Sequence, residues 1–233
     1  MWLEAIGGLA AGTGAMAYAV RSPRSSLLAP SVYQGVSSRR SIAITFDDGP
    51  SEATLCVLEL LAKYNARGTF FQCGANAERL PDVARQVVRA GHEIGNHTYS
   101  HPMIQFKSSE YIYSEMQRAQ SAIMESTGTA PVLFRAPFGV RWFGLRSAQQ
   151  RLDLLGVMWT VMGLDWKLSG KAAARRLLRG TRPGAIVCLH DGRLTRRAPD
   201  VSATLDTIRR VLPVWVDQGY QFETVSQILC KTN

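Results

Sequence analysis

Two adjacent carboxylates, Asp47 and Asp48, follow an apolar run near the start of the chain. Residues 42–46 read Ile-Ala-Ile-Thr-Phe, and Gly49 and Pro50 come directly after the two acids. At the end of a strand, neighbouring side chains project in different directions, so one carboxylate can bind a cation while the other faces a bound water. Taken alone, Asp-Asp-Gly-Pro is also typical of a turn, because every residue in it favours turns.

Two of the four histidines, His97 and His101, stand four residues apart. On a helical turn this spacing puts both imidazoles on one side, where they can bind a single metal ion through ring nitrogens. Surface histidines also fall at this spacing by chance. His92, at the start of the preceding apolar run, is interpreted as a structural residue.

Further polar groups follow later apolar runs. Arg135 is always charged and can hold a carboxylate through paired hydrogen bonds, although a surface arginine in an ordinary loop is the simpler interpretation in isolation. Asp165 and Trp166 follow the fifth run, and His190 ends the sixth, next to Asp191. A buried imidazole beside a carboxylate can have a pKa suited to catalysis, but a lone core histidine fits the same pattern.

These groups lie at the ends of short apolar runs that we expect to be strands. The runs are Ile42–Phe46, Thr69–Cys73, His92–Gly95, Val132–Arg135, Val157–Met162, Ala185–His190 and Tyr220–Val225. Between several of them, apolar residues recur at amphipathic-helix spacing: Leu55, Leu58, Leu61 and Ala62; Ile112, Met116, Ala119 and Ile123; and Val201, Leu205, Ile208 and Leu212. The alternation predicts a parallel sheet with helical crossovers, either closed into a barrel or open.

Five successive strand ends of this expected sheet carry titratable or metal-binding groups. Parallel α/β folds bind their ligands at the carboxyl ends of the strands. A purely structural account needs five independent coincidences at that edge. The joint pattern therefore favours an active site.

Five motifs, in chain order, resemble those of the polysaccharide deacetylase family, the NodB homology domain of carbohydrate esterase family four. They are Thr45-Phe46-Asp47-Asp48-Gly49-Pro50, His97-Thr98-x-x-His101, Arg135-x-Pro137-x-Gly139, Asp165-Trp166 and Leu189-His190-Asp191. The resemblance covers about residues 40 to 230. It implies an α/β fold with a single domain, a distorted (β/α) barrel of about seven parallel strands.

The resemblance also implies a metal ion and a base. Asp48, His97 and His101 would hold a divalent ion, usually Zn²⁺, and leave a position open for water. Asp47 would take a proton from that water, whose pKa the metal lowers. Arg135 would orient Asp47.

For the later motifs, the resemblance implies an acid and a substrate pocket. His190, tuned by Asp165, would protonate the departing amine, and the backbone N–H of Phe138 would stabilise the oxyanion. Trp166 would wall the pocket for the acetyl methyl group. The chain departs from the family pattern twice: Phe138 stands where tyrosine is common, and Cys188 stands where a leucine usually lines the acyl pocket. The smaller side chain at 188 leaves the acyl selectivity open.

We therefore expect a metal-dependent hydrolase that removes N-acetyl groups from aminosugar polymers or oligomers of the chitooligosaccharide or peptidoglycan type, and so cleaves C–N amide bonds. A related metal-dependent hydrolase of another amide, a cyclic amide or a lipid-linked sugar is a second hypothesis. A third is a glycan- or polyanion-binding module with an idle site. The signature of an idle site would be a lost ligand residue, and none is lost.

Residues 1–21 form an apolar N-terminal segment, residues 22–40 a polar linker, and residues 41–230 the expected catalytic domain. Ala5–Val20 carries no charge, but as a helix it spans only about 24 Å, less than the roughly 30 Å hydrocarbon core of a bilayer. A cleaved export signal and an uncleaved membrane anchor are both open interpretations. A cytoplasmic location is open as well, so the sequence does not decide the localisation.

The composition, with 46% apolar and 19% charged residues, excludes a disordered chain. Four cysteines without a Cys-x-x-Cys pair exclude a zinc ribbon and a thioredoxin-type redox pair. The net charge is +9, and residues 167–197 hold nine basic residues and one acid. This stretch is expected either to attract an anionic polymer or membrane surface, or to be a solvated face. We expect the protein to be a monomer that acts on a glycan substrate. We expect no specific nucleic-acid partner.

Overall fold

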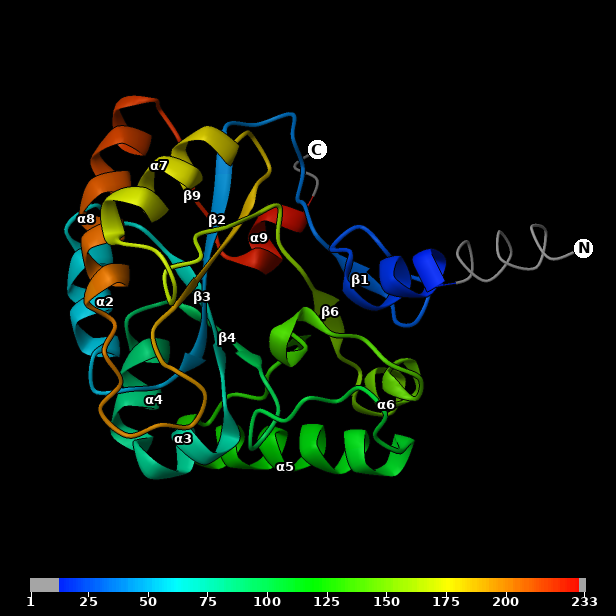
Figure 1. Ribbon diagram of the computed structural model, residues 1–233. Helices are drawn as coiled ribbons and strands as arrows, with labels where there is room; N and C mark the ends of the chain where they lie inside the picture. Colours follow the sequence, from blue (N-terminus) through cyan, green and yellow to red (C-terminus); the bar gives the residue numbers. More distant parts are fainter. Residues whose placement is uncertain (1–12, 231–233) are drawn as a thin grey trace, which may run out of the picture.

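A curled sheet of parallel strands forms the centre of the computed structural model, which describes residues 13–230 (Figure 1). The strands are β1 (Ser31–Val32), β2 (Ser41–Gly49), β3 (Gly68–Gln72), β4 (Glu93–Asn96), β5 (Leu133–Phe134), β6 (Leu155–Val157), β7 (Val161–Met162), β8 (Ile186–His190) and β9 (Gln221–Phe222). Eight of them follow the order β1-β6-β5-β4-β3-β2-β8-β7, and β9 pairs with the start of β2. Within residues 13–230 the end strands β1 and β7 do not pair, so the barrel is an open half-barrel.

Helices surround this sheet, most of them on its outer face (Figure 1). They are α2 (Thr54–Ala62), α3 (Gly74–Arg79), α4 (Pro81–Arg89), α5 (Ser109–Thr127), α6 (Leu145–Leu152), α7 (Gly170–Gly180), α8 (Ser202–Asp217) and α9 (Val225–Leu229), with a short 3₁₀ helix, η1, at Pro137–Gly139. The three helices predicted from apolar spacing are α2, α5 and α8. Pro213 lies inside α8, which nevertheless continues to Asp217. A proline removes one helix hydrogen bond, and the buried residues Leu212 and Trp215 anchor the helix on either side of it.

The distorted parallel (β/α) barrel predicted from the sequence is confirmed, with nine strands in residues 13–230 where about seven were expected. The expected strand Val157–Met162 is two strands, because the backbone changes partners between them. Met158 N–H donates to Val32 O at 2.7 Å, whereas Thr160 N–H donates to Ile186 O at 2.8 Å. The chain therefore leaves one end of the sheet at β6 and joins the other end at β7.

The two faces of the sheet have different contents because side chains alternate along a strand. On β2, Ile42, Ile44 and Phe46 lie in the main core with α2 and α8. Ala43 points the other way, into a smaller core that includes Val225 and Ile228 of α9. Helix α9 thus fills the inside of the curl (Figure 1). Thr45 and Asp47 continue this inner face.

The described segment before β2 contains a short helix and the strand β1. Residues 13–21 are helical, and β1 at Ser31–Val32 pairs with β6. The buried Arg141 guanidinium donates to the carbonyl oxygens of Ser22 and Ser25, which ties this segment to the body of the protein. Within residues 13–230, no helix is both long and apolar enough to span a bilayer. Residues 1–12 of the expected apolar segment lie outside the described residues.

Candidate metal centre and acid–base site

The carboxyl end of β2 carries Asp47 and Asp48 on a distorted stretch of backbone. Asp48 has φ of 72°, and the pairing of β2 with β3 shifts register between Asp47 and Gly49. In a regular strand the two side chains would point to opposite faces. The left-handed residue turns the Asp48 carboxylate towards the end of β4 instead. A Cβ on Gly192 would collide with the Asp48 backbone, so a glycine is required where the loop after β8 packs against it.

Asp48, His97 and His101 converge on one point. Asp48 Oδ1 lies 3.0 Å from His101 Nε2 and 3.3 Å from His97 Nε2. His97 Nδ1 lies 2.7 Å from the Arg135 carbonyl oxygen, which leaves Nε2 free to face the carboxylate. Both rings are buried, at 2% and 4% side-chain exposure. The remaining Asp48 oxygen, Oδ2, accepts from the Leu194 N–H at 2.8 Å.

These three residues fit a divalent metal ion. Asp48 Oδ1 is buried and receives no hydrogen bond of regular geometry, and one carboxylate with two imidazoles is a common set of ligands for zinc. Burial raises the pKa of the Asp48 carboxyl, but contact with His101 and His97 outweighs it, so the pKa lies well below the usual range. Asp48 is therefore ionised, as a metal ligand must be.

Asp47 is held by a buried arginine. Arg135 Nη1 donates to Asp47 Oδ1 at 2.7 Å and to Thr45 Oγ1 at 2.6 Å. The rest of the guanidinium donates to the carbonyl oxygens of Val157 and Met158, each at 3.1 Å. With its donors engaged on β2 and at the end of β6, the fully buried Arg135 fixes the Asp47 carboxylate in one orientation.

His190 pairs with Asp165. Its Nδ1 lies 3.0 Å from Asp165 Oδ1, and its backbone N–H donates to Asp165 Oδ2 at 2.9 Å. Thr204 Oγ1 donates to the same Oδ2. Burial lowers the pKa of His190, but the Asp165 charge and hydrogen bond outweigh it and raise the pKa to about 9. His190 is therefore protonated at neutral pH.

Two half-exposed aromatic rings flank the site. The Phe138 ring is 52% exposed and meets His101 edge-on, with centroids 4.7 Å apart. The Trp166 ring is 46% exposed and meets His190 in the same way, also at 4.7 Å. Phe138 has φ of 56°, a left-handed conformation that costs a non-glycine residue free energy and is concentrated at functional sites. Cys188 is buried, and its thiol lies 3.5 Å from Asp47 Oδ2.

All ten site residues predicted from the sequence therefore lie in one connected cluster, although their catalytic roles stay predictions. Sequence reasoning missed Asn76 on α3, whose amide donates to the Asp48 carbonyl oxygen at 2.8 Å, and Thr204. For Asp191, sequence reasoning noted only that it is next to His190 and did not predict its partner. Asp191 turns away to accept from Thr54 Oγ1 at 2.5 Å, and burial raises its pKa to about 7. His92 is structural, as predicted: it accepts the Gly68 N–H, and burial lowers its pKa to about 4.

The fold and the site define a parallel α/β half-barrel with an Asp-His-His cluster beside an arginine-bound aspartate at its strand ends. The family model described as polysaccharide deacetylase matches residues 34–157. Over 199 residues, the chain is 34% identical to a chitooligosaccharide deacetylase of Azorhizobium caulinodans, covering 80% of this chain and 93% of that protein. The chain therefore belongs to the polysaccharide deacetylase family, as its motifs predicted.

Two further relatives show how far the similarity extends. The peptidoglycan-N-acetylglucosamine deacetylase PgdA of Listeria monocytogenes is 32% identical over 88% of this chain, which spans 42% of that protein's length. The solved structure of BA3943, a CE4 family pseudoenzyme from Bacillus anthracis, is 26% identical and matches with a TM-score of 0.78, covering 87% of this chain and 69% of that one. The same fold thus occurs in a protein described as a pseudoenzyme, so the fold alone does not establish activity.

Proposed function

We propose that this chain is a metal-dependent hydrolase that removes N-acetyl groups from aminosugar polymers or oligomers. One observation carries the proposal: a buried Asp-His-His cluster adjoins a carboxylate held by arginine and a histidine held by a second carboxylate. Together these residues supply a cation site, a base and an acid within one connected cluster. Amide hydrolysis needs all three functions.

Asp48, His97 and His101 are the residues that would hold the divalent ion, which we take to be Zn²⁺. When bound, such an ion supplies Lewis-acid polarisation of the amide carbonyl and lowers the pKa of water.

Two side chains carry out the two proton transfers, Asp47 as the base and His190 as the acid. Asp47 Oδ1 is bound to Arg135, so Oδ2 is the atom that accepts a proton from the attacking water. His190 Nδ1 is bound to Asp165, so Nε2 is the atom that donates a proton to the departing amine. Each residue is held through one atom and is free to react through the other, and this limits the reorganisation needed during the reaction.

The substrate class rests on the relatives and on the two exposed rings. The matched relatives are named as deacetylases of chitooligosaccharide and of peptidoglycan N-acetylglucosamine. Phe138 and Trp166 expose about half of their rings beside the metal ligands and the acid, where the apolar face of a sugar can pack. We propose an N-acetylglucosamine oligomer or glycan as the substrate.

The test is acetate release from N-acetylglucosamine oligomers and from peptidoglycan glycan fragments. We expect release that a chelator abolishes and that Zn²⁺ or another divalent ion restores. Cyclic amides, lipid-linked aminosugars and other N-acylated sugars serve as comparison substrates, since relatives of this fold and the small side chain at 188 leave those reactions open. Turnover of these alone would replace the proposed substrate class, while turnover of none would favour a glycan-binding module.

Asp47→Asn separates the base from the metal site. The amide cannot accept the proton, so we expect kcat to fall about 10²–10⁴-fold, the usual contribution of a general base. Bound metal per chain should stay the same, because Asp47 is not among the three proposed ligands. His97→Ala is the matched comparison and should lose metal and activity together. Undiminished turnover in Asp47→Asn would refute the assignment.

A further inference from the structure

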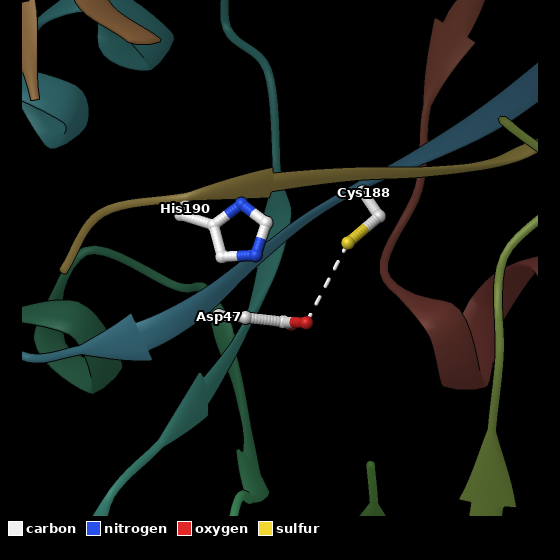
Figure 2. Close-up of side chains that lie close together, drawn as sticks. All are labelled: Asp47, Cys188 and His190. Atoms are coloured by element: carbon white, nitrogen blue, oxygen red, sulfur yellow. Dashed lines mark hydrogen bonds between the residues drawn. The ribbon is translucent and has the colours of Figure 1, made fainter. Parts of the chain in front are cut away.

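A second group of potential metal ligands lies directly beside the Asp48 cluster. It consists of Asp47, Cys188 and His190 (Figure 2). Asp47 pairs with His190 in the parallel register of β2 and β8, and Cys188, two residues earlier on β8, faces the same side. One ligand atom from each residue lies within 4.8 Å of the others. A point between three such atoms is at most about 2.8 Å from each, so shifts of under about 1 Å reach the bond lengths of zinc, 2.0–2.3 Å.

Two of the three ligands are already oriented through their other polar atoms. Arg135 holds Asp47 Oδ1, which leaves Oδ2, and Cys188 Sγ lies 3.5 Å from that oxygen. Asp165 holds His190 Nδ1, which leaves Nε2. A carboxylate behind the ligating histidine is the usual outer-shell arrangement of zinc sites. The cluster therefore presents one oxygen, one nitrogen and one sulfur towards a common centre.

The charge and chemistry of the surroundings select the kind of ion. Three buried carboxylates, Asp47, Asp48 and Asp165, lie in or beside the cluster, against two local cations, the Arg135 guanidinium and the protonated His190 ring. The local charge is therefore net negative, which favours a cation. Burial, followed by the Asp47 charge, raises the pKa of the Cys188 thiol well above its usual range. A hard cation does not displace that proton, whereas a sulfur-seeking ion does.

We propose that Asp47, Cys188 and His190 form an inhibitory site for a thiophilic divalent cation, such as Cd²⁺ or Zn²⁺ in excess. On binding, the Cys188 S–H bond and the Nε2–H bond of the protonated His190 ring both break and the two protons pass to solvent. A metal–thiolate and a metal–imidazole bond form, with no change of oxidation state. The ion binds Asp47 Oδ2 and, once its proton has left, His190 Nε2. The predicted inhibition rests on the proposed function, because Asp47 and His190 are its base and its acid. The predicted binding of the cation does not depend on that function.

The binding test uses protein already loaded with Zn²⁺ and lacking the exposed thiols Cys56 and Cys230, both replaced by serine. Cd²⁺ is added, and the ultraviolet sulfur-to-cadmium charge-transfer absorption is followed. We expect about one thiolate-bound Cd²⁺ per chain. Exchange of Zn²⁺ for Cd²⁺ at Asp48, His97 and His101 gives no such signal, since those ligands include no sulfur.

Variants then assign the signal to its residue. Cys188→Ala should abolish the absorption, while Cys73→Ala should keep it, because Cys73 is equally buried but lies outside the cluster. His190→Gln retains the thiol and should weaken Cd²⁺ binding at least about 10–100-fold, the cost seen even for outer-shell changes at metal sites. That variant keeps the test decisive if Cys188→Ala does not fold.

Activity provides a separate measurement. Cd²⁺ should inhibit the Cys73→Ala protein as it inhibits the parent, and Cys188→Ala should need at least about 10-fold more Cd²⁺ for half inhibition of its own activity. Absence of the charge-transfer band, or its persistence in Cys188→Ala, would overturn the site. A protein that binds Cd²⁺ in this way but releases no acetate would overturn only the proposed function.

Discussion

The His190–Asp165 pair sets the pH range in which the proposed acid carries its proton. Burial lowers the pKa of His190, and Asp165 opposes burial strongly enough to raise it to about 9. An acid donates only while it is protonated, so it is active below its pKa and inactive above it. We therefore expect kcat/KM to fall as the pH rises through about 9.

Asp165→Asn removes the charge that opposes burial. The pKa of His190 should then drop, and the alkaline limb of the kcat/KM profile should move down by about one pH unit or more. Asp217→Asn removes an exposed carboxylate from α8, the helix that carries Thr204, and should leave the limb in place. If both variants keep the parental limb, His190 is not the acid that this limb reports.

The site residues could be predicted from the sequence where they follow an apolar run that ends in a strand end. Asp47, Asp48 and His190 follow apolar runs, and His97 and His101 have ligand spacing, so their types and positions pointed to the site. Contacts from helices had no such signal. Asn76 and Thr204 reach the site from α3 and α8, and a single polar residue at a helix start is typical of any helix.

At the scale of elements, apolar runs and helical spacing predicted most of the sheet and its crossovers. They did not predict the break between β6 and β7, because residues 157–162 are apolar except for Thr160 and carry no glycine or proline that would mark a break. The break depends on which strands the backbone meets, β1 before it and β8 after it. Strand β1 was missed for a related reason: two residues are too few to show alternation.

Helix α9 closes the inside of the curl, and its apolar side chains should matter for stability. Ile228 is fully buried in the inner core. We expect Ile228→Ala to lower the free energy of unfolding by about 2–4 kcal/mol, measured by urea denaturation. Met124→Ala on α5, where the side chain is 46% exposed, should change it by under about 0.5 kcal/mol. Equal losses would mean that α9 does not close a core.

At the scale of the whole molecule, part of the positive charge of residues 167–197 lies on α7. Lys171, Arg175 and Arg179 recur every four residues on its exposed side, and none forms an ion pair with a carboxylate in the described part of the chain. Arg175 and Arg179 also line a groove of about 450 Å³. The predicted anionic partner would meet this surface.

We predict that the protein binds vesicles containing anionic lipid, and that the binding fades as salt is added. Each cation near such a surface contributes about 1 kcal/mol, so changing Lys171, Arg175 and Arg179 to glutamine should weaken binding roughly 100-fold in a sedimentation assay. The matched control changes Arg85, Arg151 and Arg210, which form ion pairs with neighbouring carboxylates. An equal loss in the control would mean that net charge, not α7, governs binding.

The proposed base and acid face the same side of the sheet because side chains alternate along β2 and β8, and the two strands pair in a fixed register. Odd positions 43, 45 and 47 of β2 and even positions 186, 188 and 190 of β8 share the inner side of the sheet. Inserting one residue into either strand would send its polar side chains in among the apolar helices and bring isoleucines or leucines inward. We therefore expect the protein to tolerate length changes only in its loops, because the proposed base and acid face each other only while this strand register is kept.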